Sequence, residues 1–159
     1  MRVRLATQDD FAAFMELARP VEDLFGPMVN QPGFQDALTR NFQRGSALLA
    51  ETDSGDAVGG MLFSLRTAPT YRIGWLVVDE QSRSRGLGQT LVAEGLRRWF
   101  EPPAVLEVVT FGPDHPGARS RRLYERLGFQ PQEMTTAGPE GGSRQVYRLR
   151  LDRHPDWAS

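Results

Sequence analysis

The segment from residue 83 to residue 91 reads RSRGLGQTL, in which arginines and two glycines precede an apolar helical pattern. Gly86 and Gly88 allow the main chain to bend with positive φ, and they allow a partner to approach without a Cβ in the way. The first N–H groups of the helix that follows have no internal acceptor and lie at the positive end of its dipole. Residues of these types in this order favour an anion, most often a phosphate.

Two common phosphate motifs do not fit this segment. A P-loop requires a lysine after its last glycine, and the chain contains no lysine. A dinucleotide-binding fingerprint requires a third glycine, and Leu91 stands at that position. Glu107 lies within an apolar run and not at a strand end, from which a carboxylate could reach a ribose. Because all 19 basic residues are arginine, an arginine in this loop is by itself weak evidence for a phosphate site.

The composition is typical of a globular domain. The 159 residues are 40% hydrophobic and 25% charged, which is enough for one domain with a buried core. A net charge of −1 gives no sign of a nucleic-acid or membrane partner. With no cysteine and two histidines, we expect no disulfide, no thiolate nucleophile and no metal. The N-terminus lacks a signal-peptide pattern and no apolar run approaches about 18 residues, so we expect a cytoplasmic protein.

Hydrophobic periodicity predicts an α/β fold with a mixed sheet, in the order β-α-α-β-β-β-α-β-α-β-β. The predicted strands are 3–6, 46–51, 57–66, 71–78, 104–111, 129–135 and 144–151. The first predicted helix begins after Thr7, which is its N-cap. The other predicted helices cover 34–44, 87–100 and 116–127, and residues 19–33 are predicted to form a loop or a broken helix. The run at 104–111 is almost continuously apolar, as in a central strand covered on both faces. We expect residues 1–151 to form one domain and residues 152–159 a C-terminal tail.

The chain resembles the GCN5-related N-acetyltransferase (GNAT) superfamily. The segment LVVDEQSRSRGLGQTLV is similar to the family's acetyl-CoA motif, with Arg83, Gly86 and Gly88 at its Q/R-x-x-G-x-G/A positions. RLYERLGF at 122–129 is similar to the second signature, a helix with a tyrosine followed by glycine and an aromatic residue. Two signatures in the right order on the right elements are far more specific than either one, and the element order agrees over essentially the whole chain.

The resemblance implies a GNAT-like fold with acetyl-CoA as co-substrate. Backbone N–H groups of the glycine loop would hold the pyrophosphate, and main-chain groups at the end of strand 71–78 would pair with the pantetheine. That strand would bulge and separate from strand 104–111 to admit the thioester, and Gly74 suits a bulge. The implied cofactor-binding residues are Leu76, Val77, Val78, Arg83, Ser84, Arg85, Gly86, Leu87, Gly88 and Gln89.

The resemblance also implies direct attack of a primary amine on the thioester, with Tyr124 as general acid for the leaving thiolate. A tyrosine on an amphipathic helix is more commonly a core residue with a polar tip. The family often has a glutamate base on the strand before the loop, but this strand has no carboxylate and Trp75 stands near that position. Glu107 is a candidate base, since burial would raise its pKa, although a structural pair with an arginine fits equally well. A mechanism without an enzyme base is a further alternative.

The second signature departs from the family pattern, because Gly117 and Ser120 stand where asparagine and alanine are common. His115 is expected to be a loop residue that could also orient coenzyme A or the acceptor. The arginines of this helix are expected to form a solvated face, from which one could meet the 3′-phosphate. These are Arg119, Arg121, Arg122 and Arg126.

The acceptor side is expected to be partly acidic and lined by aromatic residues. Its candidates are Glu22 and Asp23, which could also supply a base, with Phe25, Tyr71 and Trp75. Such a cleft suits a small cationic amine, and an exposed protein terminus also fits. We expect an amine acceptor, no nucleic-acid or membrane partner, and a homodimer, which is common for proteins of this kind. The alternatives are a non-catalytic acyl-CoA-binding or regulatory module, and an enzyme that uses another acyl group or a hydroxyl acceptor.

Overall fold

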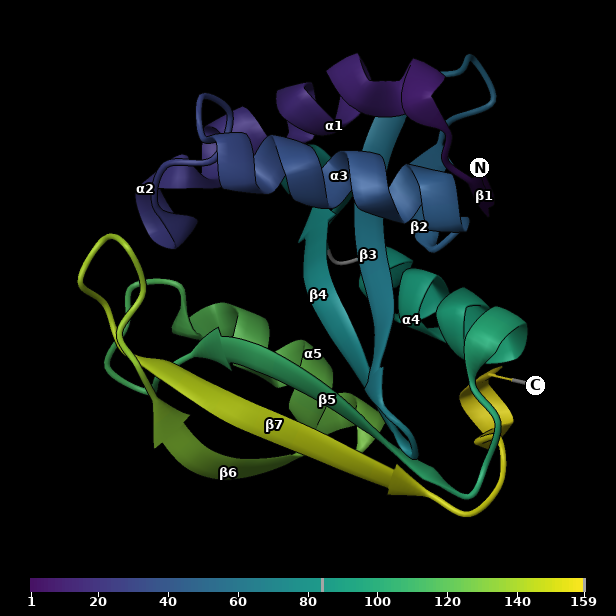
Figure 1. Ribbon diagram of the computed structural model, residues 1–159, viewed down its shortest axis with the longest axis vertical. Helices are drawn as coiled ribbons and strands as arrows, with labels where there is room; N and C mark the ends of the chain where they lie inside the picture. The colour runs from purple at the N-terminus through teal and green to yellow at the C-terminus, as the bar shows by residue number, and fades with distance from the viewer. Residues whose placement is uncertain (84, 159) are drawn as a thin grey trace.

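The computed structural model describes residues 1–83 and 85–158, except for the side chains of residues 66 and 67. Within these residues, seven strands form one mixed sheet in the order β1-β2-β3-β4-β5-β7-β6 (Figure 1). The strands are β1 (Arg2–Leu5), β2 (Ala47–Glu51), β3 (Ala57–Thr67), β4 (Thr70–Val78), β5 (Ala104–Phe111), β6 (Gln130–Thr135) and β7 (Arg144–Leu151). The β4–β5 pair is parallel, and the other neighbouring strands are antiparallel.

Helices cover both faces of the sheet. They are α1 (Phe11–Ala18), α2 (Glu22–Phe25), α3 (Pro32–Arg44), α4 (Leu87–Trp99) and α5 (Arg121–Leu127). α1 and α3 pack on one face of β2, β3 and β4 (Figure 1), where Leu62 joins their core cluster. α4 and α5 pack on the opposite face with Met61 and Phe63, because successive side chains of a strand point to opposite faces.

The predicted order of elements is confirmed, since the short helix α2 lies within the predicted broken helix at 19–33. Helices cover only one face of β5, whereas the sequence predicts that both faces are covered. Leu106 and Val108 are buried under α4 and α5, whereas Glu107 and Val109 on the other face are only half-buried. The expected burial on both faces is wrong, because α1 and α3 reach β2, β3 and β4 but not β5.

The last residues, expected to form a tail, pack against α4. Nε2 of His154 lies 2.9 Å from the carbonyl oxygen of Phe100, just after α4 ends. Ala158 is fully buried in the cluster beneath α4, and Trp157 packs against the same cluster. This segment therefore completes the core on that side of the sheet.

β4 contains a bulge at Gly74, as its sequence predicts. Leu62 of β3 pairs with Trp75 and Phe63 pairs with Ile73, so that Gly74 is the extra residue. One extra residue reverses the alternation of side chains. Ile73 therefore faces α4 and α5, whereas Trp75 faces α1 and α3.

Beyond this bulge, β4 separates from β5. The pairs between the two strands run from Thr70 with Val105 to Ile73 with Val108. Residues 76–78 keep their partners on β3 but have none on β5. Peptide groups on this edge of β4 are consequently left without a strand partner, although backbone donors and acceptors normally require one.

Candidate active site

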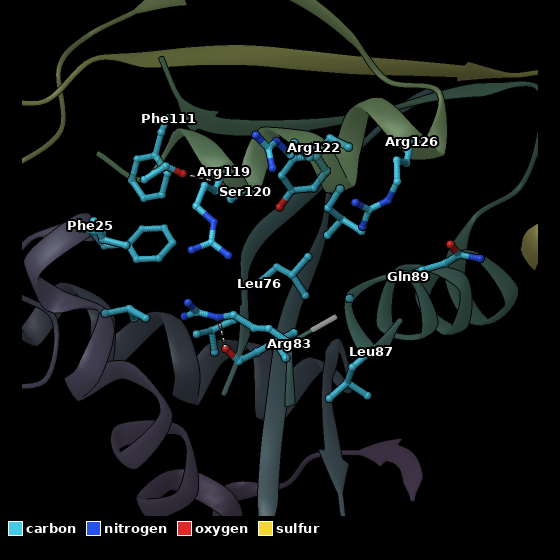
Figure 2. Close-up of a pocket in the computed structure, with 18 of the residues that line it drawn as sticks. Phe25, Leu76, Arg83, Leu87, Gln89, Phe111, Arg119, Ser120, Arg122 and Arg126 are labelled. Atoms are coloured by element: carbon cyan, nitrogen blue, oxygen red, sulfur yellow. Dashed lines mark hydrogen bonds between the residues drawn. The ribbon is translucent and has the colours of Figure 1, made fainter. Parts of the chain in front are cut away.

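A cleft of about 600 Å³ opens where β4 and β5 separate (Figure 2). Its walls come from the last residues of β4, the start of α4, the end of β5, α2 and the segment that leads into α5. Most of the predicted cofactor residues line it, namely Leu76, Val77, Val78, Arg83, Gly86, Leu87, Gly88 and Gln89. Arg85 instead lines a different hollow with Asp56 and Asp79. Ser84 lies outside the described residues.

Gly86 places the start of α4 at the cleft. It is the N-cap of α4 and has a left-handed backbone with φ of +75°, a conformation that other residues rarely adopt. A Cβ at this position would meet no atom within 4 Å, so the backbone faces open space. The N–H of Thr90 donates the first hydrogen bond of the helix, to the carbonyl of Gly86. The N–H groups of residues 87–89 therefore have no acceptor within the helix. The predicted anion site therefore has open backbone donors.

Gly88 lines the cleft and also faces the neighbouring helix. It lies inside α4, and a Cβ there would come within 2.8 Å of Cδ2 of Leu123 on α5. The absence of a Cβ at Gly88 therefore leaves room for the Leu123 side chain of α5.

Four arginines line the cleft: Arg83, Arg119, Arg122 and Arg126. Figure 2 shows Arg126 near Gln89 of α4, whereas Arg119 lies between Phe111 and Arg83. Nε of Arg83 donates a hydrogen bond of 3.1 Å to the carbonyl of Val78, at the end of β4. The chain as a whole has a net charge of −1, so this cleft concentrates positive charge that the composition does not reveal.

Tyr124 lines the same cleft from α5. Its ring is 6% exposed and packs edge-on against Phe129, with ring centroids 5.4 Å apart. Among the described residues, its hydroxyl has no hydrogen-bond partner in the protein. Burial raises the pKa of Tyr124, and its hydroxyl is protonated at neutral pH as that of an ordinary tyrosine is. Its place in the cleft wall is what suits it to donate a proton.

Glu107, the candidate base, is held away from this cleft. It lies on the face of β5 opposite to α5, and its carboxylate is 3.2 Å from Nε of Arg148 and 3.6 Å from Nε of Arg72. These arginines stand beside it in the register of β7 and β4. The structure therefore places Glu107 in an ion-pair network and does not bring it to Tyr124.

The acidic residues expected at the acceptor side do not line the cleft either. Oε2 of Glu22 accepts hydrogen bonds from the N–H groups of Met28 and Val29, at 2.6 and 3.1 Å. These bonds lower the pKa of Glu22 and hold the loop that follows α2. Asp23 is exposed on α2. The expectation of a partly acidic cleft is contradicted by these positions.

The aromatic candidates separate into one cleft residue and two core residues. Phe25 lines the cleft and packs against Phe111, with ring centroids 4.9 Å apart. Trp75 instead packs against Phe34 in the core under α1 and α3, because the bulge turns it away. Tyr71 packs against Phe100 in the other core, and its hydroxyl accepts a hydrogen bond from the N–H of Glu101. Neither of the last two residues lines the cleft.

A network behind Phe111 was not predicted from the sequence. His115 stacks on Phe111, with centroids 4.2 Å apart, and its Nε2 is 2.6 Å from a carboxylate oxygen of Glu140. Nδ1 of His115 accepts the N–H of Gly117, so Nε2 is the nitrogen that donates to Glu140. Arg144 binds both carboxylate oxygens of Glu140, at 2.6 and 2.9 Å. The turn between β6 and β7 is thereby joined to the aromatic wall of the cleft.

Within the described residues, no helix is long and apolar enough to cross a bilayer. The same residues contain no group of three His, Asp or Glu side chains arranged to hold a metal ion.

The fold and the cleft define a class of protein. A mixed sheet splits between β4 and β5, and a glycine-led helix N-terminus opens into the gap. Comparison with protein-family models matches residues 11–129 to the acetyltransferase (GNAT) family. The chain belongs to this family.

Solved structures share the fold. The structure of Ard1 from Thermoplasma volcanium has a TM-score of 0.75 and 16% identity, over 94% of this chain and 97% of that one. The ribosomal-protein-alanine N-acetyltransferase of Brucella melitensis has a TM-score of 0.72 and 20% identity, over 95% and 100%. The yncA protein of Salmonella typhimurium, solved with acetyl-CoA, has a TM-score of 0.69 and 20% identity, over 98% of this chain and 96% of that one. At these identities the similarity concerns the fold. Comparison with curated protein sequences gave no match.

Proposed function

We propose that the protein is an acetyl-CoA-dependent N-acetyltransferase that acts on a primary amine. The observation that carries the proposal is the start of α4 opening into the gap between β4 and β5, with Tyr124 in the same cleft. Membership of the GNAT family and the acetyl-CoA complex of yncA support the choice of donor. Acetyl-CoA would supply the acyl group as an activated thioester, so that no covalent enzyme intermediate is needed.

The residues present fit this donor. The free N–H groups at residues 87–89 suit a pyrophosphate, and the open space in front of Gly86 lets it approach the backbone. Arg126, on the side of Gln89 at the start of α4, could add charge-assisted hydrogen bonds to phosphate oxygens. Leu76 and Val78 lie on the edge of β4 that has no partner on β5. Arg83 already donates to the Val78 carbonyl, and the amides of the pantetheine could pair with the other main-chain groups of this edge in the manner of an added strand.

The chemistry requires few protein groups. A C–N bond forms between the amine and the thioester carbonyl, the C–S bond breaks, and the thiolate takes a proton. Tyr124 would donate this proton, because its hydroxyl is protonated at neutral pH and it lines the cleft, and water would return a proton from the amine to the tyrosinate. Every Asp, Glu and His is among the described residues, and none lines the cleft. We therefore propose that the acceptor amine loses its proton to water and not to an enzyme base.

Calorimetric titration with acetyl-CoA tests the donor site. We expect binding in the micromolar range for the wild-type protein. Gly86→Ala should weaken it at least ten-fold, because an alanine at φ of +75° is strained and must distort the start of α4. Gly33→Ala is the matched control, because Gly33 has an ordinary φ and open space around it, and it should bind as the wild type does.

Turnover is measured by release of the coenzyme A thiol, and the reading has no protein background because the chain has no cysteine. Thiol release that depends on a primary amine supports the proposal. Binding of acetyl-CoA without turnover of any amine would instead favour a non-catalytic acyl-CoA-binding module. Failure to bind acetyl-CoA would overturn the proposed function.

A further inference from the structure

We infer that the acceptor is a small amine that also carries a carboxylate, as an amino acid does, and that Arg119 is the residue that selects it. This inference rests on the proposed function and specifies its acceptor. It replaces the cationic amine that the sequence favours.

The charge of the cleft is the first argument. Its lining contains four arginines and no carboxylate, and all aspartates and glutamates of the chain are described. A cationic acceptor would therefore meet no carboxylate of the protein in this lining, and any arginine that the phosphates of the donor leave unpaired would repel it. An anionic group on the acceptor reverses the sign of that interaction.

Two carboxylates on the elements beside Phe25 and Phe111, the part of the cleft that we call the acceptor end, are already bound elsewhere. Glu22 is occupied by the N–H groups of two residues in the loop after α2. Glu140 is bound by Arg144 through both oxygens and by His115. The guanidinium of Arg144 holds the pKa of Glu140 at about 2, so this carboxylate is charged but already neutralised by its partner. Neither group is available to bind an ammonium ion.

Arg119 is the arginine placed for an acceptor. It belongs to the turn at 118–120 that leads into α5, and Figure 2 shows its guanidinium directed into the cleft beside the Phe25 and Phe111 side chains. It is exposed, and among the described residues it has no ion pair or hydrogen bond through its side chain. Arg126 lies on the side of Gln89, where the start of α4 would bind the donor. A guanidinium binds a carboxylate through two parallel hydrogen bonds, which fixes the orientation of the ligand.

The acceptor end is also bounded on one side. Nη2 of Arg144 reaches the carbonyl of Phe25 at 3.5 Å, and a Cβ on Gly26 would lie 2.9 Å from Cγ of Pro139. The segment after α2 and the turn between β6 and β7 thus touch and form a wall on that side. With Phe25 and Phe111 inside that wall, the space suits a small acceptor with an apolar part next to its charged group.

The test compares amino acids with the amines obtained by removing their carboxyl group. L-Phenylalanine with phenethylamine, and L-leucine with isopentylamine, form two such pairs within a panel of the common amino acids. Rates of thiol release are compared at equal concentrations of the neutral amine, so that the different basicities of the nitrogens do not enter. We expect kcat/KM to be at least ten-fold higher for the amino acid of the preferred pair.

Two variants separate the acceptor site from the donor site. Arg119→Gln should lower the ratio of kcat/KM between the amino acid and its amine at least ten-fold, while the Kd for acetyl-CoA changes less than two-fold. Arg126→Gln should weaken the binding of acetyl-CoA and leave this ratio unchanged. Equal rates within each pair, faster reaction of the amines, or an equal loss of donor and acceptor binding in Arg119→Gln would each overturn the inference. Binding of acetyl-CoA with no turnover of any compound would overturn the proposed function, and this inference with it.

Discussion

Tyr124 has a buried ring and a hydroxyl that is open to the cleft. Its ring packs in the core between α5 and β7, and its hydroxyl has no protein partner among the described residues. The hydroxyl is not one of the buried polar atoms that lack a partner, so solvent in the cleft can reach it. A bound thioester could therefore take the place of water at this hydroxyl.

Tyr124→Phe should lower kcat about a hundred-fold, since a positioned general acid contributes at least that much. The unfolding free energy should hardly change, because the ring remains and no protein hydrogen bond is lost. Acetyl-CoA turnover and denaturant unfolding measure the two effects. The matched control is Tyr147→Phe, which loses the 3.0 Å hydrogen bond from its hydroxyl to Glu125. This variant should lose about 1 kcal/mol of stability and keep its kcat. A fully active Tyr124→Phe protein would exclude the acid role.

At the scale of elements, the turn between β6 and β7 is held against α2 by Glu140 and its partners. The pKa of Glu140 lies at about 2, below its ordinary value of 4.5, first because Arg144 donates hydrogen bonds to it and then because His115 does. A carboxyl whose pKa is lowered by folding stabilises the native state above its unfolded pKa. That contribution is lost as the pH falls through the folded pKa.

Glu140→Gln should therefore reduce the unfolding free energy at pH 7, by about 1.5 kcal/mol if one charge-assisted hydrogen bond is lost. The difference from the wild type should shrink as the pH is lowered from about 4.5 to about 2, where the wild-type carboxyl becomes protonated as well. Urea unfolding of both proteins at a series of pH values measures this difference in unfolding free energy. A difference that stays constant over this range would mean that the charge of Glu140 does not hold the turn.

At the scale of the whole molecule, the gap between β4 and β5 interrupts the sheet in the middle of the fold (Figure 1). A ligand that pairs with the free edge of β4 would join the two halves of the sheet. Such a ligand binds the folded chain and not the unfolded one, so its binding free energy adds to stability.

Acetyl-CoA at a hundred times its Kd should raise the stability by about 2.7 kcal/mol. For a chain of this length, that corresponds to an increase in Tm of roughly 5 to 10 °C. Thermal unfolding with and without the ligand measures the shift. A nicotinamide dinucleotide should leave the Tm unchanged, because its fingerprint is absent. The shift should also decrease with salt, because arginines line the cleft. An equal shift with both nucleotides would show that the site does not distinguish the donor.

Local patterns were sufficient for the elements and for the start of α4 that opens into the cleft. Side-chain period distinguishes strands from helices, and a glycine before an apolar helical pattern marks an exposed helix start. Gly86 and the bulge at Gly74 could both be predicted because their causes lie within a few residues of them. The expectation that both faces of β5 are covered was wrong, because the covering of its second face depends on α1 and α3, which are far away in the chain.

The acceptor side was decided only by the tertiary structure, because its contacts join distant residues. The bulge reverses the side chains of β4, which sends Trp75 into the core and leaves Leu76 in the cleft. Strand register places Arg148 beside Glu107 and takes that carboxylate away from the reaction. His115 and Glu140 are 25 residues apart and meet through a turn whose path no local pattern specifies. The sequence by itself determined the order of the elements and the glycine-led start of α4, on which the proposed donor site rests. The fold determined the charge that an acceptor meets, because charge in a cleft depends on which side chains are left unpaired after packing.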